Sequence, residues 1–438
     1  MKRPRVLFIS ADAVGASMAG VGIRAYELAR AVRPYADVAI AAPEQGTTSL
    51  PDIDVVTYHP RASRALRPQI SAADVIVAQP QWPLVGHWLR NSGARLIFDL
   101  YDPEPFEGLE YLADRSRLGD IAQTLTLDRI TEALRNGHHF MCASGRQRDM
   151  WLGVMLAERL IRPAVYERDP SMLNTIDEVP FGVSAEPPTH TGSKGPRSRF
   201  DFGAGDEIVL WNGGIWEWLD ASSAIRAVSE LIERRPSVRL VFMGSASHAP
   251  ARRATVQART LAADLGLLDR HVFFNTDWVP YARRGDWLLD ADCAISTHVE
   301  HLETRFAFRT RLLDCFWSGL PIVCTRGDEL ASRVERDDLG ATVPQGDVPA
   351  LALAIDQVLS RGRAHYQGRL AAAARASAWP VVAAPLIKWV TAADLPPRLG
   401  DGTSAQLTRR TFVRVRNHGY RVGRSTLNAI GLREWPTL

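Results

Sequence analysis

Short apolar runs alternate with helix-like patterns along most of the chain. In the first half these runs are rich in Val, Ile, Leu and Ala and end at glycine, proline or charged residues, which is typical of buried parallel strands. Helical periodicity follows several of them, as after Gly22 and over residues 121–134. Strands are therefore expected at residues 6–9, 37–42, 55–58, 75–78, 95–100, 140–143 and 179–183.

The second half repeats this alternation after residues 184–205, a segment rich in Pro, Gly, Ser and Thr that has the composition of a linker. A helix is expected over residues 348–359. Two consecutive arrays of strands and helices predict an α/β fold with two Rossmann-like, doubly wound domains that face a central cleft. Strands are expected at residues 208–211, 238–243, 272–274, 293–296 and 321–325.

We assign residues 1–183 to the first domain and residues 206–380 to the second. Residues 381–395 are expected to form a helix that packs back towards the first domain, and residues 396–438 form a basic tail. In both domains, ligands are expected at the carboxyl ends of the strands.

Composition narrows the class of protein without naming a function. The chain has 438 residues, of which 46% are hydrophobic and 23% charged, as in a globular protein with a sizeable core. A net charge of +3 is too small to favour nucleic acid as a partner. The four cysteines lie in apolar contexts without CxxC pairs or zinc-spaced histidines, so we expect reduced thiols in a cytoplasmic protein.

The apolar run near the N-terminus is too short for a signal peptide, and no uncharged apolar run reaches the roughly 18 residues of a membrane span. Any contact with a membrane is therefore expected to be peripheral.

The densest group of charged residues lies between two expected strands of the second half. Within residues 296–325 it comprises Glu303, Arg305, Arg309, Arg311 and Asp314. Guanidinium groups and helix N-termini both suit phosphate oxygens, so the cluster fits an anionic, hydroxylated ligand. A solvated helix face with internal ion pairs, such as Arg311 with Asp314, explains the pattern equally well.

A second group of acidic residues follows the expected strand at residues 95–100. Asp99 and Asp102 begin it, and further carboxylates continue to residue 110. Acidic residues at the carboxyl end of a parallel strand lie where α/β folds bind ligands, although they are also common at helix N-termini. Pro103 and Pro105 favour a loop here.

Taken together, these segments resemble the GT-B glycosyltransferases of the family-4 type, which transfer a sugar from a nucleotide-sugar donor. The likeness extends to about Leu395. It rests on Gly20-Val21-Gly22 with Arg24 and Glu27, on residues 179–183, on the segments 212–218 and 301–305, and on Asp314 followed by Gly319-Leu320-Pro321-Ile322-Val323.

The resemblance implies a GT-B architecture and roles for particular residues. Asp314 would bind the ribose of the donor, since a carboxylate accepts hydrogen bonds from two neighbouring hydroxyls. The loop before its helix would lie against the diphosphate and the donor sugar, and the two glycine segments would approach the same group. These positions are Phe308, Arg309 and Thr310 in the loop, Gly213 and Gly214 in the second domain, and Gly20 and Gly22 in the first.

The chain also departs from the family pattern. Phe306 stands where the family has the first glutamate of its pair, and Glu303 lies three residues earlier. Gly214 and Leu219 stand where the family carries an Arg and a Lys for the diphosphate. A buried diphosphate still needs cationic partners, so we expect Arg305, Arg309 and Arg311 to replace them, with residues 305 and 309 on one helix face.

For catalysis we single out Asp102, Glu303 and Arg309. An inverting enzyme would need Asp102 or Asp99 as the base for the acceptor hydroxyl. A retaining enzyme, which the resemblance favours, would let the departing phosphate take the proton and would use Asp102 to orient the acceptor. We expect no metal and no cofactor beyond the nucleoside-diphosphate sugar as co-substrate, and His298 and His301 are interpreted as structural.

The predicted function is transfer of a sugar to a glycan, glycolipid or small-molecule hydroxyl acceptor, in cell-envelope polysaccharide or glycolipid assembly. Three alternatives stay open. The chain could be a catalytically silent binding or regulatory protein with this fold, a glycosyltransferase of natural-product biosynthesis, or an enzyme of another GT-B chemistry, sugar-nucleotide epimerisation.

The end of the chain differs in composition from the rest. Residues 407–433 hold seven arginines and no Asp or Glu, with apolar and aromatic residues among them. This pattern favours contact with an anionic membrane on the inner face of the plasma membrane. An RNA-binding tail and a solvated terminus are the alternatives.

Overall fold

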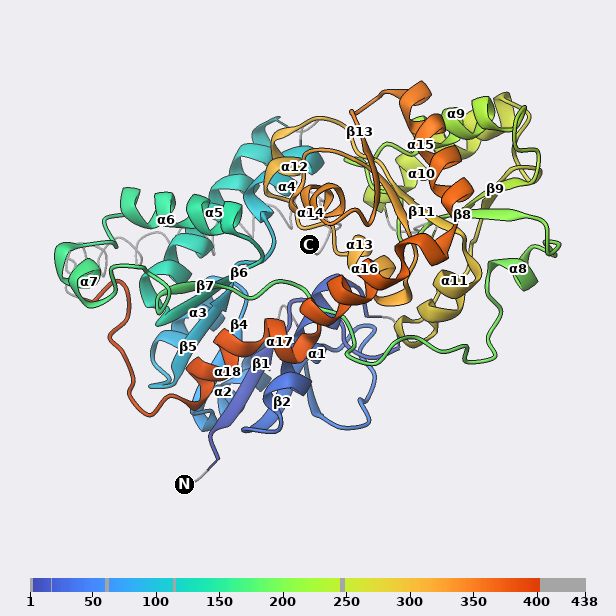
Figure 1. Ribbon diagram of the computed structural model, residues 1–438. Coiled ribbons are helices and arrows are strands. Elements are labelled where there is room, and N and C mark those ends of the chain that lie inside the picture. Colours follow the sequence, from blue (N-terminus) through green and yellow to red (C-terminus); the bar gives the residue numbers. More distant parts are fainter. Residues whose placement is uncertain (1–2, 17, 60–62, 113–115, 245–248, 402–438) are drawn as a thin grey trace, which may run out of the picture.

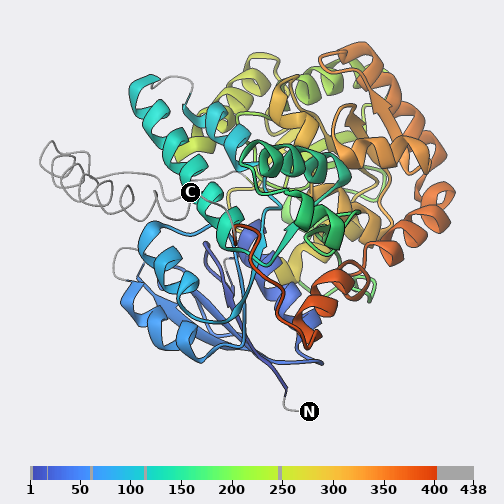
Figure 2. The same ribbon diagram turned by 90° about the vertical axis from the view of Figure 1, so that its left-hand side faces the viewer.

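The computed structural model describes residues 3–16, 18–59, 63–112, 116–244 and 249–401. Within them it has two α/β bodies, joined by a linker and by the helices at the end of the described chain (Figures 1 and 2). The basic segment at residues 407–433 lies outside the described residues. No described helix is both long and apolar enough to cross a membrane.

The first body is built on a sheet of seven parallel strands. Its order is β3-β2-β1-β4-β5-β6-β7, and the central strands are buried on both faces because helices cover them. The strands are β1 (Arg5–Ile9), β2 (Asp37–Pro43), β3 (Asp54–Tyr58), β4 (Val75–Ala78), β5 (Arg95–Asp99), β6 (His139–Cys142) and β7 (Ile176–Glu178).

Helices follow most of these strands and return the chain to the amino edge of the sheet. They are α1 (Gly20–Val32), a 3-10 turn η1 (Ser63–Ala65), α2 (Leu66–Ala72), α3 (Pro83–Arg90), α4 (Glu104–Leu112), α5 (Ser116–Asn136), α6 (Gly145–Ala157) and α7 (Pro163–Arg168).

The second body has six parallel strands in the order β10-β9-β8-β11-β12-β13. They are β8 (Glu207–Trp211), β9 (Val238–Phe242), β10 (Val272–Phe274), β11 (Cys293–Ser296), β12 (Ile322–Thr325) and β13 (Gly340–Val343). Its helices are α9 (Ala221–Leu231), α10 (Ala249–Asp264), η2 (Tyr281–Arg283), α11 (Arg284–Asp290), α12 (Leu302–Phe306), α13 (Arg311–Ser318), α14 (Glu329–Arg336), α15 (Val348–Arg361) and α16 (Arg363–Ala376).

The two predicted Rossmann-like sheets are confirmed. In each sheet the strand order reverses once, between β1 and β4 and between β8 and β11. A doubly wound sheet binds its ligands beyond the carboxyl ends of the strands at such a reversal. The fold therefore predicts a ligand site at the loops after β1, β4, β8 and β11.

The linker and the last helices connect the two bodies. The linker contains the short helix α8 (Pro196–Arg199), where Arg197 pairs with Asp292 of the second body at 3.0 Å. After α16, the short helices α17 (Trp379–Val382) and α18 (Ala384–Thr391) return to the first body and lie against α1 (Figure 1). The Arg95 guanidinium donates hydrogen bonds to backbone carbonyls at the end of α18, among them that of Ala392 at 2.9 Å.

Three local predictions were wrong. Residues 179–183 are not a strand, because the sheet ends with β7 and only Val183 forms an isolated bridge, with Ala378. The acidic segment after β5 forms the helix α4 despite its prolines, since Pro103 precedes the helix and Pro105 falls in the first turn, where a missing N–H costs nothing. Apart from the wrong predictions, one strand, β13, was not predicted at all.

The third error concerns the cluster at residues 296–325. Arg305 lies in α12 and Arg309 in the break before α13, so the two arginines do not share a helix face.

Candidate functional site

A tight glycine turn lies at the reversal point of the second sheet, directly after β8. Gly213 has φ = 137°, a value that L side chains rarely adopt. The Trp211 indole N–H donates to the Gly214 carbonyl at 3.2 Å, and Gly244, after β9, packs against the Gly213 backbone. The turn therefore brings bare backbone to the edge where this fold binds ligands.

The Arg311 guanidinium lies under this turn. Its Nη2 donates to the Gly214 carbonyl at 3.0 Å, and the Asn212 amide donates to the Arg311 carbonyl at 2.7 Å. The Nη1 atom of Arg311 is buried and has no hydrogen-bond partner. In the described part of the chain, no carboxylate forms an ion pair with Arg311. Burial, and then the neighbouring Arg309, lower the pKa of Arg311 to about 9. Such an arrangement favours an anion beside the turn.

Arg309, by contrast, already has an anionic partner. Its Nη1 and Nη2 donate to Oε1 and Oε2 of Glu303 at 2.9 and 2.6 Å, and both side chains are buried. His301 Nδ1 lies 3.6 Å from Glu303 Oε2. The two predicted catalytic residues of this segment therefore form a bidentate pair with each other.

Asp314 is held by an arginine outside the predicted cluster. Arg284 Nε donates to Asp314 Oδ1 at 2.9 Å, while its guanidinium stacks on the rings of Tyr281 and Trp317, 3.7 and 4.3 Å from their centroids. Arg284 is buried, and Asp314 keeps partial exposure. This pairing fixes the direction of one carboxylate oxygen at the start of α13.

In the first body, Asp99 and Asp102 have different surroundings. Arg24 donates to both oxygens of Asp99, at 2.6 and 2.9 Å, in a buried pair. Burial, then repulsion from Asp99, raise the pKa of Asp102 from 3.8 to about 7. Burial also raises the pKa of Glu107 well above its usual value, and Asp102 and Glu303 add to that rise. Asp102 is therefore the carboxyl of this loop that can exchange a proton near neutral pH.

Contacts between the two bodies bring these groups together. The Gln147 amide, at the start of α6, donates to the carbonyls of Tyr101 and Phe306, at 2.7 and 2.9 Å. Phe106 of α4 stacks on Phe306 of α12, with 5.0 Å between ring centroids. Arg146 donates to the Gly327 carbonyl at 2.7 Å. Phe306 thus makes an aromatic contact between the bodies at the position where the family pattern has a glutamate.

The two glycines of the first body differ in what they face. A Cβ at Gly22 would lie 2.0 Å from the Ala13 carbonyl oxygen, so Gly22 is required for packing of α1 against its own loop. Gly20 begins α1, is exposed, and lies opposite the Tyr101 hydroxyl. Of the two, only Gly20 presents its backbone to solvent.

The remaining predicted site residues surround the break between α12 and α13. Phe308 is partly buried against the core, Thr310 is the first residue before α13, and Arg305 is exposed at the end of α12. No group of His, Cys, Asp and Glu among the residues described is placed to hold a metal ion.

Sequence reasoning missed Glu107, Arg284 and Gln147. Glu107 lies in the segment for which the sequence predicts a loop. Gln147 lies in a polar segment after β6, where the sequence indicates no function. Arg284 lies thirty residues from Asp314, and their contact depends on how α11 packs against α13.

Comparison with known proteins finds a family likeness in the second body. Residues 206–361, which contain the second sheet, match the profile of the family described as "Glycosyl transferases group 1". No curated protein matches the chain.

Solved structures resemble the whole described chain. Anabaena HepE, in complex with UDP and glucose, has a TM-score of 0.65 and 13% identity, with 89% of this chain and 100% of that chain covered. WaaG, a glycosyltransferase involved in lipopolysaccharide biosynthesis, has a TM-score of 0.60 and 13% identity, with 88% and 99% covered. Sucrose-phosphate synthase from Thermosynechococcus elongatus has a TM-score of 0.58 and 17% identity, with 94% and 100% covered. The chain therefore has the GT-B fold.

Proposed function

We propose that this protein is a glycosyltransferase that moves a sugar from a nucleoside-diphosphate sugar to a hydroxyl acceptor. The observation that carries the proposal is Arg311, a cation with a buried, unpartnered Nη1 beside the Gly213–Gly214 turn. A buried guanidinium without a counter-ion is costly, and a diphosphate would supply both the charge and the missing acceptors.

The donor would lie along the second body. Its diphosphate would meet Arg311, the glycine turn and the N–H groups at the start of α13, and its ribose would meet Asp314. Arg284 orients Asp314 through Oδ1, which leaves the carboxylate to accept hydrogen bonds from ribose hydroxyls. Gly20, at the start of α1, would approach the diphosphate from the first body.

The acceptor would lie against the first body. With a pKa near 7, Asp102 can accept a proton from a hydroxyl or hold that hydroxyl by a hydrogen bond. Asp99 is committed to Arg24, which makes it the weaker candidate base. We favour retention of configuration, in which the leaving phosphate takes the proton and Asp102 orients the acceptor.

In this proposal Glu303 and Arg309 act as one unit. Both terminal nitrogens of Arg309 donate to Glu303. Arg309 would therefore stabilise the leaving phosphate while it stays paired with Glu303, so that its positive charge is shared between the two anions. Their closeness to Asp102 and Glu107 would place the pair between donor and acceptor.

The wider role we propose is in polysaccharide or glycolipid assembly, in the cytoplasm and at the inner face of the membrane. Two of the similar structures support this, since WaaG is involved in lipopolysaccharide biosynthesis and HepE was solved in complex with UDP and glucose. The basic tail would contribute membrane contact.

The test is release of nucleoside diphosphate from a panel of common sugar nucleotides by the purified full-length protein, with and without added membrane lipid. We expect turnover with at least one donor, and we expect Asp314→Ala to weaken donor binding about tenfold or more, since it removes a charged hydrogen-bond acceptor. An exposed carboxylate substitution at the end of α10, Asp264→Ala, serves as the control. No release from any donor would reject the enzyme.

A second candidate, a catalytically silent GT-B protein, is favoured by one observation. Arg309 and Asp314 both have ion-pair partners within the chain, so most of the charged site is satisfied without a ligand. Binding of a nucleoside diphosphate without turnover of any sugar nucleotide would identify this case.

A further inference from the structure

One face of the first body, formed by η1, α2 and α3, carries charge and aromatic side chains that the proposed transferase site does not use. Between residues 63 and 93 the chain has three arginines and a single acidic residue, Asp74. Asp74 precedes β4 at the amino edge of the sheet and pairs with Arg5. Arg90 pairs with Glu132, whereas Arg64 and Arg67 are exposed. The face therefore has a local excess of positive charge.

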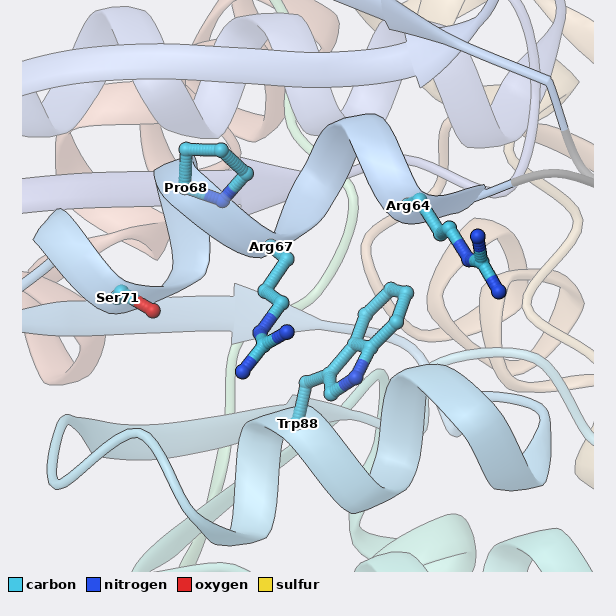
Figure 3. Close-up of a pocket in the computed structure, with 5 residues that line it drawn as sticks. All are labelled: Arg64, Arg67, Pro68, Ser71 and Trp88. Carbon is cyan, nitrogen blue, oxygen red and sulfur yellow. The ribbon is translucent and has the colours of Figure 1, made fainter.

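Arg64 and Arg67 flank an indole ring. Figure 3 shows both arginines extending from η1 and α2 towards Trp88, which rises from α3. With Pro68 and Ser71 they line a depression of about 440 Å³ at the surface. An indole between two guanidinium groups suits the headgroup level of a bilayer, where tryptophan is enriched and phosphates are the available anions.

Large apolar side chains stand exposed next to this depression. Trp82 and Leu84, at the start of α3, are 50% and 51% exposed. Leu84 and Trp88 are four residues apart on α3 and so lie on one face of the helix. The Arg129 guanidinium lies over one face of the Trp82 ring, 5.4 Å from its centroid, and Trp82 remains half exposed.

The position of the face is also informative. Helices α2 and α3 begin after β3 and β4, so η1, Trp82 and Leu84 lie at the carboxyl edge of the first sheet. Asp102 follows β5 at the same edge. A bilayer against this face would lie on the side of the first body where the acceptor is proposed to bind.

We propose that the η1–α2–α3 face docks onto an anionic phospholipid bilayer, with lipid phosphates at Arg64 and Arg67 and with Trp82 and Leu84 in the interface. Charge complementarity selects this occupant, because the face is basic and apolar at once and has no carboxylate of its own besides the paired Asp74. The residues of this surface are other than those of the basic segment at residues 407–433. The binding does not depend on transferase activity, so it can fail while the proposed function stands.

The experiment is sedimentation of the full-length protein with vesicles of phosphatidylglycerol and phosphatidylcholine, at a lipid concentration where half of the wild type is bound. Arg64→Ala/Arg67→Ala should lower the partition coefficient about five-fold per arginine, and raised salt should reduce the difference. Trp82→Ala/Leu84→Ala should lower it several-fold while keeping the salt dependence.

The matched control removes two exposed arginines from the second body, Arg234→Ala/Arg270→Ala, and should bind as the wild type does. All the altered side chains are exposed, and circular dichroism of each variant checks that it is folded. Wild-type binding by the Arg64/Arg67 variant would overturn the proposal and assign any membrane contact to other parts of the chain. Equal binding to pure phosphatidylcholine vesicles, or no vesicle binding at all, would overturn it as well.

Discussion

At the residue scale, the arginines of the segment between β11 and β12 divide by their partners. Arg309 is neutralised by Glu303, Arg305 is exposed, and Arg311 is placed under a glycine turn with Nη1 unpartnered. Their spacing in the sequence could not distinguish them, because the partner of Arg311 comes from the turn after β8 and that of Arg309 comes from the first turn of α12. Arg311 is the one of the three whose buried terminal guanidinium nitrogen has no partner, and we assign it to the ligand.

This assignment predicts an effect of Arg311 on stability. Arg311→Met removes a buried cation and keeps much of the side-chain volume, so the free energy of unfolding without ligand should stay the same or rise. Thermal unfolding of the ligand-free protein measures it. A fall in Tm as large as that for a buried ion-pair residue would show that Arg311 is structural.

The raised pKa of Asp102 predicts that the stability of the protein depends on pH. Because its pKa in the folded protein is raised from 3.8 to about 7, the stability that its protonated form contributes is fully present below 3.8 and is lost as pH rises through about 7. Asp102→Asn cannot ionise, so it should be more stable than the wild type at pH 8 and closer to it at pH 5. Thermal unfolding across this range tests the prediction.

The same residue should shape the pH dependence of turnover. We expect kcat/KM of the wild type to rise through pH 7 and Asp102→Asn to lose this inflection. An inflection that persists in the variant would assign it to another group.

At the element scale, the segments that the sequence predicted well were those with a strong apolar pattern. The buried strands β1, β4, β5, β8 and β11 could be placed because a parallel strand covered on both faces needs a continuous apolar run. Helix α4 and strand β13 were missed. The helix has Pro103 before it and Pro105 in its first turn, and the strand is short, lies at the edge of its sheet and is only partly buried.

The candidate site shows the same difference between what a sequence pattern predicts and what tertiary packing decides. Asp314, Gly213 and Gly214 could be proposed from a motif, but the partners of the charged residues depend on tertiary packing. Arg284 reaches Asp314 from α11, and Gln147 reaches Phe306 from the other body. The hydrophobic periodicity of one segment does not predict contacts with residues of other elements.

The pairing between Glu303, in the first turn of α12, and Arg309, in the loop after this helix, predicts a strong asymmetry between single and double variants. Arg309→Ala leaves the Glu303 carboxylate buried without its bidentate partner and should destabilise the protein by about 3–5 kcal/mol. The double variant Glu303→Gln/Arg309→Met removes both charges and should recover most of that loss. Urea unfolding of the wild type and of these variants measures the difference. Equal stability of Arg309→Ala and the wild type would contradict the buried pair.

At the scale of the whole molecule, the two bodies meet through contacts on both sides of the proposed site. Phe106 with Phe306, and Gln147 with the Phe306 carbonyl, join α4 and α6 to α12. The returning helices α17 and α18 join the far side, against α1. These contacts hold Asp102 and Glu107 of the first body close to the charges of Glu303 and Arg309 of the second, as a two-substrate transfer requires.

The tail carries a separate prediction at this scale. Removing residues 407–438 should lower binding to anionic vesicles, because each arginine near the headgroups contributes about 1 kcal/mol. Sedimentation with anionic vesicles compares the truncated and full-length proteins. Unchanged binding would show that the tail has no part in membrane contact.

The central claim is that a nucleoside diphosphate binds beside Arg311 and the Gly213–Gly214 turn, which are in contact with each other. Calorimetric titration of the wild type and Arg311→Met with a panel of nucleoside diphosphates tests it most directly, with Arg305→Ala as the control that removes an exposed arginine. We predict binding of at least one nucleotide by the wild type and the control, and a loss of about tenfold to a hundredfold in affinity for Arg311→Met, as for a charged hydrogen bond. Equal affinity of all three proteins, or no binding by the wild type, would contradict the account.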